Sequence, residues 1–131
     1  MTIGEMIRNE LVLNPAVLEL VSGRIFPNEL PQQTALPAIC YSIVSGVPEL
    51  SFDGSVSSRL RNVRVQIDCY ARAVSGGATA YEGAHAVADA VNEVIGNLAR
   101  PELSASLEVE RDLFDNVTQY HRVSMDFSVW A

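Results

Sequence analysis

The chain has 131 residues, of which 48% are apolar and 19% are charged, and its formal net charge is −7. This length suits one domain with a single core, so we expect one domain over residues 1–131. An acidic chain gains no binding affinity from the release of counterions on nucleic acid, which disfavours a DNA-binding role. It has no apolar run of about 18 residues, so we expect no membrane span. Its first residues lack the basic segment followed by an apolar segment that is typical of a signal peptide, so we expect a cytoplasmic protein.

Two helical patterns open the chain. Apolar residues recur at helical spacing between residues 3 and 11, and Asn14-Pro15 supplies a favoured N-cap followed by proline at the first helical position. Gly23 is placed to end the second pattern. The sequence predicts two short helices, or one helix broken at the proline, before a short strand at 24–26.

Residues 62–70 (NVRVQIDCY) alternate strictly between apolar and polar, which is typical of a strand with one buried face. Residues 38–45 alternate in the same way. The register that matches the apolar faces of the two strands sets Ile39 opposite Ile67. It requires a loop with an odd number of residues, and the three residues 52–54 supply one. The sequence therefore predicts an antiparallel hairpin.

The apolar face of this hairpin becomes polar toward its tip, where Arg61 and Arg59 follow Val63. A face that stops being apolar has left the core, so we expect the hairpin to protrude. Arginine favours bidentate pairing with carboxylates, which makes the tip a candidate dock for a neighbouring subunit, with a merely solvated hairpin as the alternative. The candidate interface residues are Leu50, Phe52, Asp53, Arg59, Arg61 and Arg64.

A longer helix and a second hairpin complete the chain. Thr79 and Glu82 fit a capping box, and a wide apolar stripe follows over residues 79–98. Pairing Val109 with Val123 aligns the apolar residues of the last two strands. This register again requires a loop with an odd number of residues, around Asp115-Asn116. The same register sets Glu110 opposite Arg122, and Arg111 opposite His121.

These elements predict the α+β class. We expect an antiparallel sheet of about four main strands, one long helix packed on one face, short N-terminal helices and a protruding β-hairpin. The other face of the sheet is expected to be polar. Its candidate acidic residues are Glu108, Glu110 and Asp126.

The reactive side chains form no recognisable catalytic or metal set. Cys40 and Cys69 fall on opposite faces of the first hairpin, which forbids a disulfide between them. His85 and His121 lack metal-like spacing relative to these cysteines, and His121 is expected to be solvated near a hairpin tip. We expect no catalytic residue, no metal and no cofactor.

The carboxylates of the polar face leave two interpretations open. Paired carboxylates can carry out acid–base chemistry, but a flat exposed face gives them no pocket. Alternatively, they line a surface shared with other subunits. A deep pocket at Glu108, Glu110 and Asp126 would favour a small-molecule enzyme.

Several segments together resemble a known family. The helical start, the stretches VSGRIFPNELP, LPAICYSIVSGVPE and RNVRVQIDCYA, the helix VADAVNEVI and the final FSVWA are similar to tail completion proteins, or tail terminators, of long-tailed bacteriophages. The similarity covers nearly the whole chain through hydrophobic patterns rather than an invariant motif.

The resemblance implies a structural virion protein of a phage or prophage, assembled in the bacterial cytoplasm. Such a protein forms a ring, usually a hexamer, that caps the tail tube and joins it to the head connector. DNA passes through the ring without specific binding, and neither a cofactor nor a membrane is involved. The alternative within the same setting is a head-closure or minor tail adaptor protein of similar fold.

Overall fold

The computed structural model describes residues 2–49, 60–73 and 79–131. Within these ranges the chain forms three helices and six strands, and the α+β class is confirmed. In chain order the elements are α1 (Ile3–Val12), α2 (Pro15–Val21), β1 (Ile25–Pro27), β2 (Ala38–Glu49), β3 (Leu60–Ala71), α3 (Ala80–Ile95), β4 (Ala99–Arg100), β5 (Leu103–Phe114) and β6 (His121–Trp130).

Each helix begins at a side-chain cap that the sequence supplies. The Asn14 side chain accepts from the backbone N–H of Val17 at 3.1 Å, with Pro15 opening α2. The Thr79 hydroxyl oxygen accepts from the backbone N–H of Glu82 at 3.1 Å, which starts α3 as expected. A capped first turn leaves fewer unsatisfied backbone donors, so these starts are fixed locally.

The strands form one mixed sheet in the order β1-β2-β3-β6-β5-β4. β1 pairs with β2 in parallel, and the other pairs are antiparallel. The expected sheet of four antiparallel strands is therefore incomplete, because β1 and β4 extend it and β1 makes it mixed. The short strand expected at 24–26 is present as β1, one residue further on, whereas the two residues of β4 are too few to give a periodic signal in the sequence.

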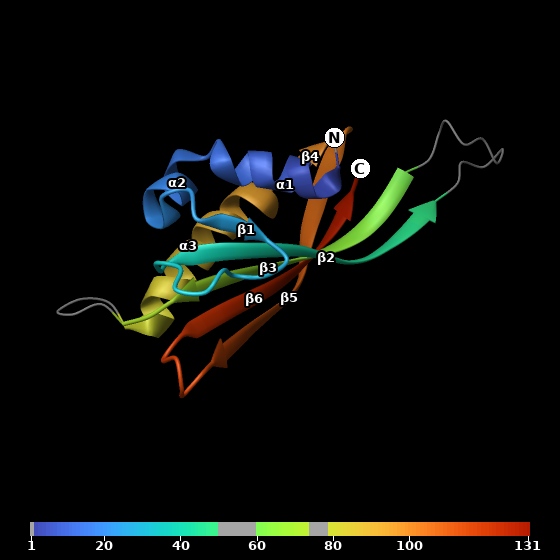
Figure 1. Ribbon diagram of the computed structural model, residues 1–131. Coiled ribbons are helices and arrows are strands. Elements are labelled where there is room, and N and C mark those ends of the chain that lie inside the picture. The colour runs from blue at the N-terminus through green and yellow to red at the C-terminus, as the bar shows by residue number, and fades with distance from the viewer. Residues whose placement is uncertain (1, 50–59, 74–78) are drawn as a thin grey trace.

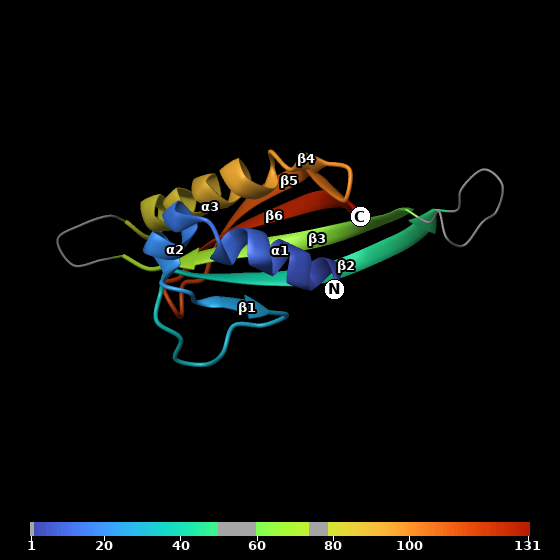
Figure 2. The ribbon, with the colours of Figure 1, turned by 90° about the horizontal axis from the view of Figure 1, so that it is seen from above.

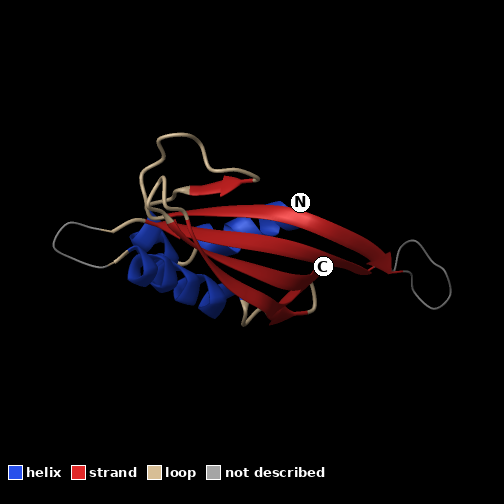
Figure 3. Cartoon of the chain, turned by 90° about the horizontal axis from the view of Figure 1, so that it is seen from below, coloured by secondary structure: helices blue, strands red, loops and turns tan. Residues whose placement is uncertain are grey.

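All three helices lie on one face of the sheet (Figure 2). Seen from the opposite side, the strands carry no helix among the described residues (Figure 3). The apolar stripe of α3 packs on β3 and β6, and the side chains between the layers include Ile67 and Phe127, both fully buried. Burying each large aliphatic or aromatic side chain stabilises the fold by about 1.5–3 kcal/mol.

The register between β2 and β3 differs from the expected one. Ile39 pairs with Cys69 and Tyr41 with Ile67, so the apolar faces match but the strands are shifted by two residues. A further register shift lies between Ile43 and Ser45. The bulge adds a residue to one strand, which an unbroken alternation cannot predict. The expected 52–54 loop falls outside the described residues.

The register between β5 and β6 was also predicted wrongly. Val109 pairs with Asp126, and Glu110 pairs with Met125 rather than Arg122. A register shift between Leu107 and Val109 places the bulge at Glu108. Beyond the bulge each β5 side chain points to the face opposite to the one expected, because side chains on a strand alternate with period two.

The strand pair β2–β3 continues past the rest of the molecule (Figure 1). The point of departure is visible in β2, where Tyr41 is 8% exposed and Ile43 is 48% exposed although both follow the same alternation. We call the part of this pair beyond Ile43 the ribbon. Its described part supports the expected protrusion, because no helix covers the strands there.

The two cysteines are free thiols, as expected, on opposite faces of the hairpin. Burial raises the pKa of Cys40 to about 11, and burial also raises the pKa of Cys69. Thiols with raised pKa values stay protonated and poorly nucleophilic at neutral pH. Both side chains therefore serve packing rather than chemistry.

Replacing Ile67 with Asp should unfold the domain, because Ile67 is fully buried between the sheet and the helices. An unpaired charge at this position costs several kcal/mol, comparable with a total stability of about 5–15 kcal/mol. Circular dichroism during thermal unfolding measures the effect. Val117→Asp is the control, because Val117 is 91% exposed and its change should leave the melting temperature nearly unaltered.

Candidate functional site

Two of the six predicted interface residues, Arg61 and Arg64, belong to the described part of the ribbon. Leu50, Phe52, Asp53 and Arg59 fall outside the described residues. Arg61 pairs with Pro48 in the described part of β3, and Arg64 pairs with Ser45 where the ribbon leaves the body. The side chain of Arg64 is 43% exposed, and its guanidinium lies 3.6 Å from the Asp126 carboxylate.

Asp126 is the centre of a charge network on the helix-free face of the sheet. Its side chain is only 12% exposed, and it pairs with Arg64 on β3 and with Arg111 on β5, the latter at 3.3 Å. Both arginines are more than two-fifths exposed. The carboxylate predicted to belong to an open acidic surface is therefore already neutralised within the subunit.

Glu108 and Glu110 differ from Asp126, since both are exposed. They lie on β5, whose outer edge is covered by β4 only at Leu103 and Ser104. Among the described residues no other strand pairs with this edge. An open strand edge with exposed backbone groups and carboxylates is a surface that another chain can cover.

The structure gives the enzyme hypothesis no pocket at these carboxylates. Two hollows, of about 650 and 660 Å³, lie elsewhere, one beside the N-terminus of α1 and the base of the ribbon, the other beside the β5–β6 turn. Neither is lined by Glu108, Glu110 or Asp126. Beyond the bulge Glu110 pairs with the buried Met125 and so lies on the helix-covered side of the sheet, whereas Asp126 lies on the polar face, so the three predicted acidic residues do not form one surface.

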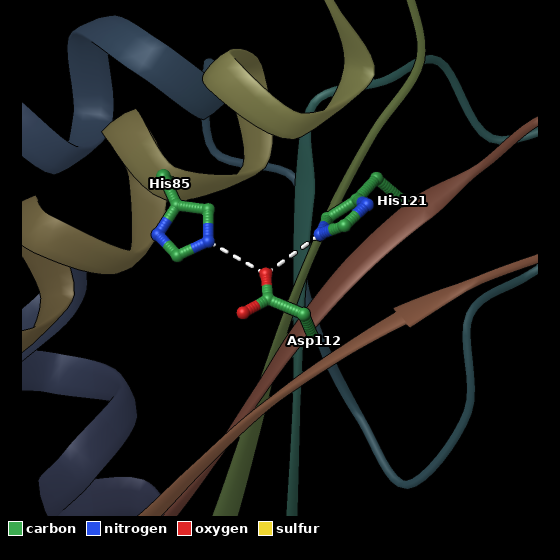
Figure 4. Close-up of side chains that lie close together, drawn as sticks. All are labelled: His85, Asp112 and His121. Carbon is green, nitrogen blue, oxygen red and sulfur yellow. Dashed lines mark hydrogen bonds and ion pairs between the residues drawn. The ribbon is translucent and has the colours of Figure 1, made fainter.

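A cluster that the sequence analysis missed connects α3 to the β5–β6 hairpin (Figure 4). Nε2 of His85 lies 2.6 Å from Oδ1 of Asp112, and Nε2 of His121 lies 2.7 Å from the same oxygen. A carboxylate only accepts, so each imidazole donates its Nε2–H. The three residues come from three separate elements, and one oxygen joins them.

The predicted surroundings of His121 were wrong. His121 is 8% exposed and pairs with Phe114, not with Arg111. The cause is the bulge at Glu108, because it turns Asp112 toward the helix-covered face where His121 and His85 lie. The sequence carries no signal for a bulge at this position, so spacing alone could not have found the cluster.

The hydrogen bonds of the cluster also act on Asp112. The bond from His121 lowers the pKa of the Asp112 carboxyl, and the bond from His85 lowers it further, against a smaller cost of desolvation. The ring of Tyr81 lies 4.3 Å from the ring of His85 and 5.2 Å from that of His121, measured between centroids. The charged carboxylate is thus held between two imidazoles with an aromatic ring beside them.

A helix-covered sheet, a projecting ribbon and an open strand edge are features of a protein that contacts other chains. The sequence matches the family described as tail completion protein gp17 over residues 5–131. The chain belongs to this family, and it is therefore a structural tail protein. The resemblance found in the sequence is therefore confirmed.

The fold also occurs in a solved virus-like particle. A chain in the virion of a native gene transfer agent particle superimposes with a TM-score of 0.65 at 15% identity, over 95% of this chain and 90% of that one. A similarity at this level of identity establishes the shared fold. A search of curated proteins gives no match. None of the described helices is long and apolar enough to cross a membrane.

Replacing Asp126 with Asn should lower the free energy of unfolding by about 1–3 kcal/mol, because it removes the charge that Arg64 and Arg111 share. Urea unfolding measures the change. Glu108→Gln is the matched control, since Glu108 is exposed and surface changes of this kind stay within about 0.5 kcal/mol. Equal effects from both variants would contradict a distinct role for Asp126.

Proposed function

We propose that this protein is a tail terminator. In this proposal its subunits form a ring, a hexamer, that caps the completed tail tube and joins it to the head connector of a long-tailed phage or prophage. Assembly takes place in the bacterial cytoplasm. The observation that carries the proposal is the match to the tail completion family over residues 5–131, together with a ribbon that continues past the end of its pairing with β6 at Asn62.

The ring contact joins two different surfaces of neighbouring subunits. The ribbon continues β2 and β3, whereas the open strand edge belongs to β5 on the other side of the sheet. Contacts between unlike surfaces are heterologous, and they close into rings when the rotation between subunits allows it. This arrangement supports a ring in preference to a two-fold dimer.

Charge supports the same pairing. Glu108 and Glu110 are exposed on β5, while Arg64 is held by Asp126. The intersubunit ion pairs are therefore assigned to Arg59 and Arg61. The proposal assigns Leu50, Phe52 and Asp53, which lie between Glu49 and Leu60 in the sequence, to the same contact. Arginine–carboxylate pairs across such a contact fix its orientation as well as its rate of formation.

The net charge of −7 also fits a protein that DNA passes without binding. Phosphate-binding proteins gain affinity from arginine and lysine that displace condensed counterions. An acidic ring lacks this gain and repels the duplex instead. The proposal therefore includes no specific DNA contact, no cofactor and no catalytic step.

Deleting the gene from the phage or prophage that carries it should leave tails of abnormal length, because nothing stops the tail tube from growing. Negative-stain electron microscopy of lysates measures the lengths. Normal tails that remain unattached to heads would contradict the terminator and support the head-closure or minor tail adaptor. Complementation with the intact gene is the control and should restore normal tails.

Replacing Glu108 and Glu110 with Arg should weaken ring formation about tenfold or more, because the changed edge repels Arg59 and Arg61 of the neighbour. Exchanging those two arginines for Glu should weaken it similarly, and combining all four changes should restore it. Light scattering after gel filtration, with and without tail tubes, measures the assembly.

Glu29→Arg with Glu93→Arg is the matched control, because it changes the net charge equally at two exposed positions away from the proposed contact. This control should assemble like the unaltered protein. If the variant with all four substitutions assembles no better than either double variant, Glu108 and Glu110 do not face Arg59 and Arg61 of the neighbouring subunit.

A further inference from the structure

We propose that His85, Asp112 and His121 bind a divalent transition-metal ion, Zn²⁺ or a cation of similar chemistry. The site is not a part of the proposed ring contact, and it stands on the side-chain geometry of the folded subunit. The three side chains offer two imidazole nitrogens and one carboxylate oxygen, and all three ligand atoms lie within 4.8 Å of one another.

The donor set selects the class of metal. Imidazole nitrogen suits Zn²⁺, Cu²⁺, Ni²⁺ and Fe²⁺, whereas Mg²⁺ and Ca²⁺ require mainly oxygen donors. Two nitrogens and one oxygen match the three-ligand sets of zinc sites that leave a fourth position to water. With a half-exposed carboxylate, the cluster has an open side where water can complete the coordination.

The present distances define the adjustment that a metal ion requires. Ligand atoms around a tetrahedral Zn²⁺ lie about 3.3 Å apart, because the Zn–N and Zn–O distances are about 2.0–2.2 Å. Oδ1 of Asp112 lies 2.6 and 2.7 Å from the two Nε2 atoms, so it must move away from each by roughly 0.6–0.7 Å. All three ligand atoms already lie within 4.8 Å of one another, and the Asp112 side chain is 43% exposed, so it has room to rotate.

Metal binding replaces the hydrogen on Nε2 of each imidazole with the metal ion. In the metal-free site each Nε2 carries the hydrogen that it donates to Asp112. In the metal-bound site each Nε2 uses its lone pair, and the hydrogen moves to Nδ1. No oxidant is needed: a neutral imidazole only moves its hydrogen to Nδ1, and an imidazolium releases one proton to water.

The bound ion joins elements that are far apart in the sequence. His85 lies on α3, whereas Asp112 and His121 lie at the turn end of the β5–β6 hairpin (Figure 4). This end of the sheet lies away from the ribbon (Figure 1). A cross-link here holds the helix layer to the sheet edge whose outer side we assign to the neighbouring subunit.

The unaltered protein provides the first test. After chelator treatment, adding ZnCl₂ should raise the melting temperature by about 5–10 °C at a hundredfold excess over the dissociation constant, and MgCl₂ should not. NMR spectra that correlate ring nitrogens with ring protons should show both Nε2 signals moving, which is readable because the chain has only two histidines. No Zn²⁺ binding by calorimetry would overturn the proposal.

Single variants provide the second test. His85→Ala and Asp112→Asn should each reduce Zn²⁺ affinity at least tenfold and remove the thermal shift, because each deletes one ligand. Glu93→Gln, an exposed change on α3, the helix that carries His85, is the matched control and should bind Zn²⁺ normally. Equal affinity in all three variants would place the bound metal elsewhere and overturn the assignment.

A spectroscopic measurement separates coordination from a loss of folding. Co²⁺ in place of Zn²⁺ should give visible absorption bands of a four-coordinate ion in the unaltered protein. His121→Gln removes a ligand from a nearly buried position, so its fold is checked by circular dichroism. A folded His121→Gln variant that keeps the same cobalt spectrum would exclude His121 as a ligand and contradict the site.

Discussion

The packing of three helices against one face of the sheet is the constraint on which the remaining structure depends. The stripe of α3 covers β3 and β6, and α1 and α2 complete the layer beside it (Figure 2). Because each strand of the body presents alternate side chains to this layer, its faces are fixed as apolar or polar. Where the helices end, the same strands continue as the ribbon, and Ile43 becomes half exposed.

Two bulges modify this alternation, and both lie at sites of functional interest. The bulge in β2 falls where the ribbon leaves the body, between Ile43 and Ser45. The bulge in β5 falls at Glu108 and turns Asp112 toward the helices. An extra residue bends a strand and re-aims the side chains beyond it. The same device therefore directs the projecting strands and assembles the histidine–aspartate cluster.

The polar face serves the subunit as well as its surroundings. Asp126 is neutralised by Arg64 and Arg111, which leaves Glu108 and Glu110 as the exposed carboxylates nearest the open edge of β5. The ribbon and the β5 edge lie on different sides of the sheet, and the metal-type cluster lies at the end away from the ribbon.

The sequence by itself determined the α+β class, the capped starts of α2 and α3, the faces of β3 and β6 that are buried, and the family. These follow from local periodicity and capping, which act over a few residues. Only the tertiary structure decided the registers, the parallel pairing of β1, the short strand β4, the pairing of Asp126 and the meeting of His85 with His121. The physical reason is that a strand register depends on packing against distant elements, and one bulged residue reverses every side chain that follows it.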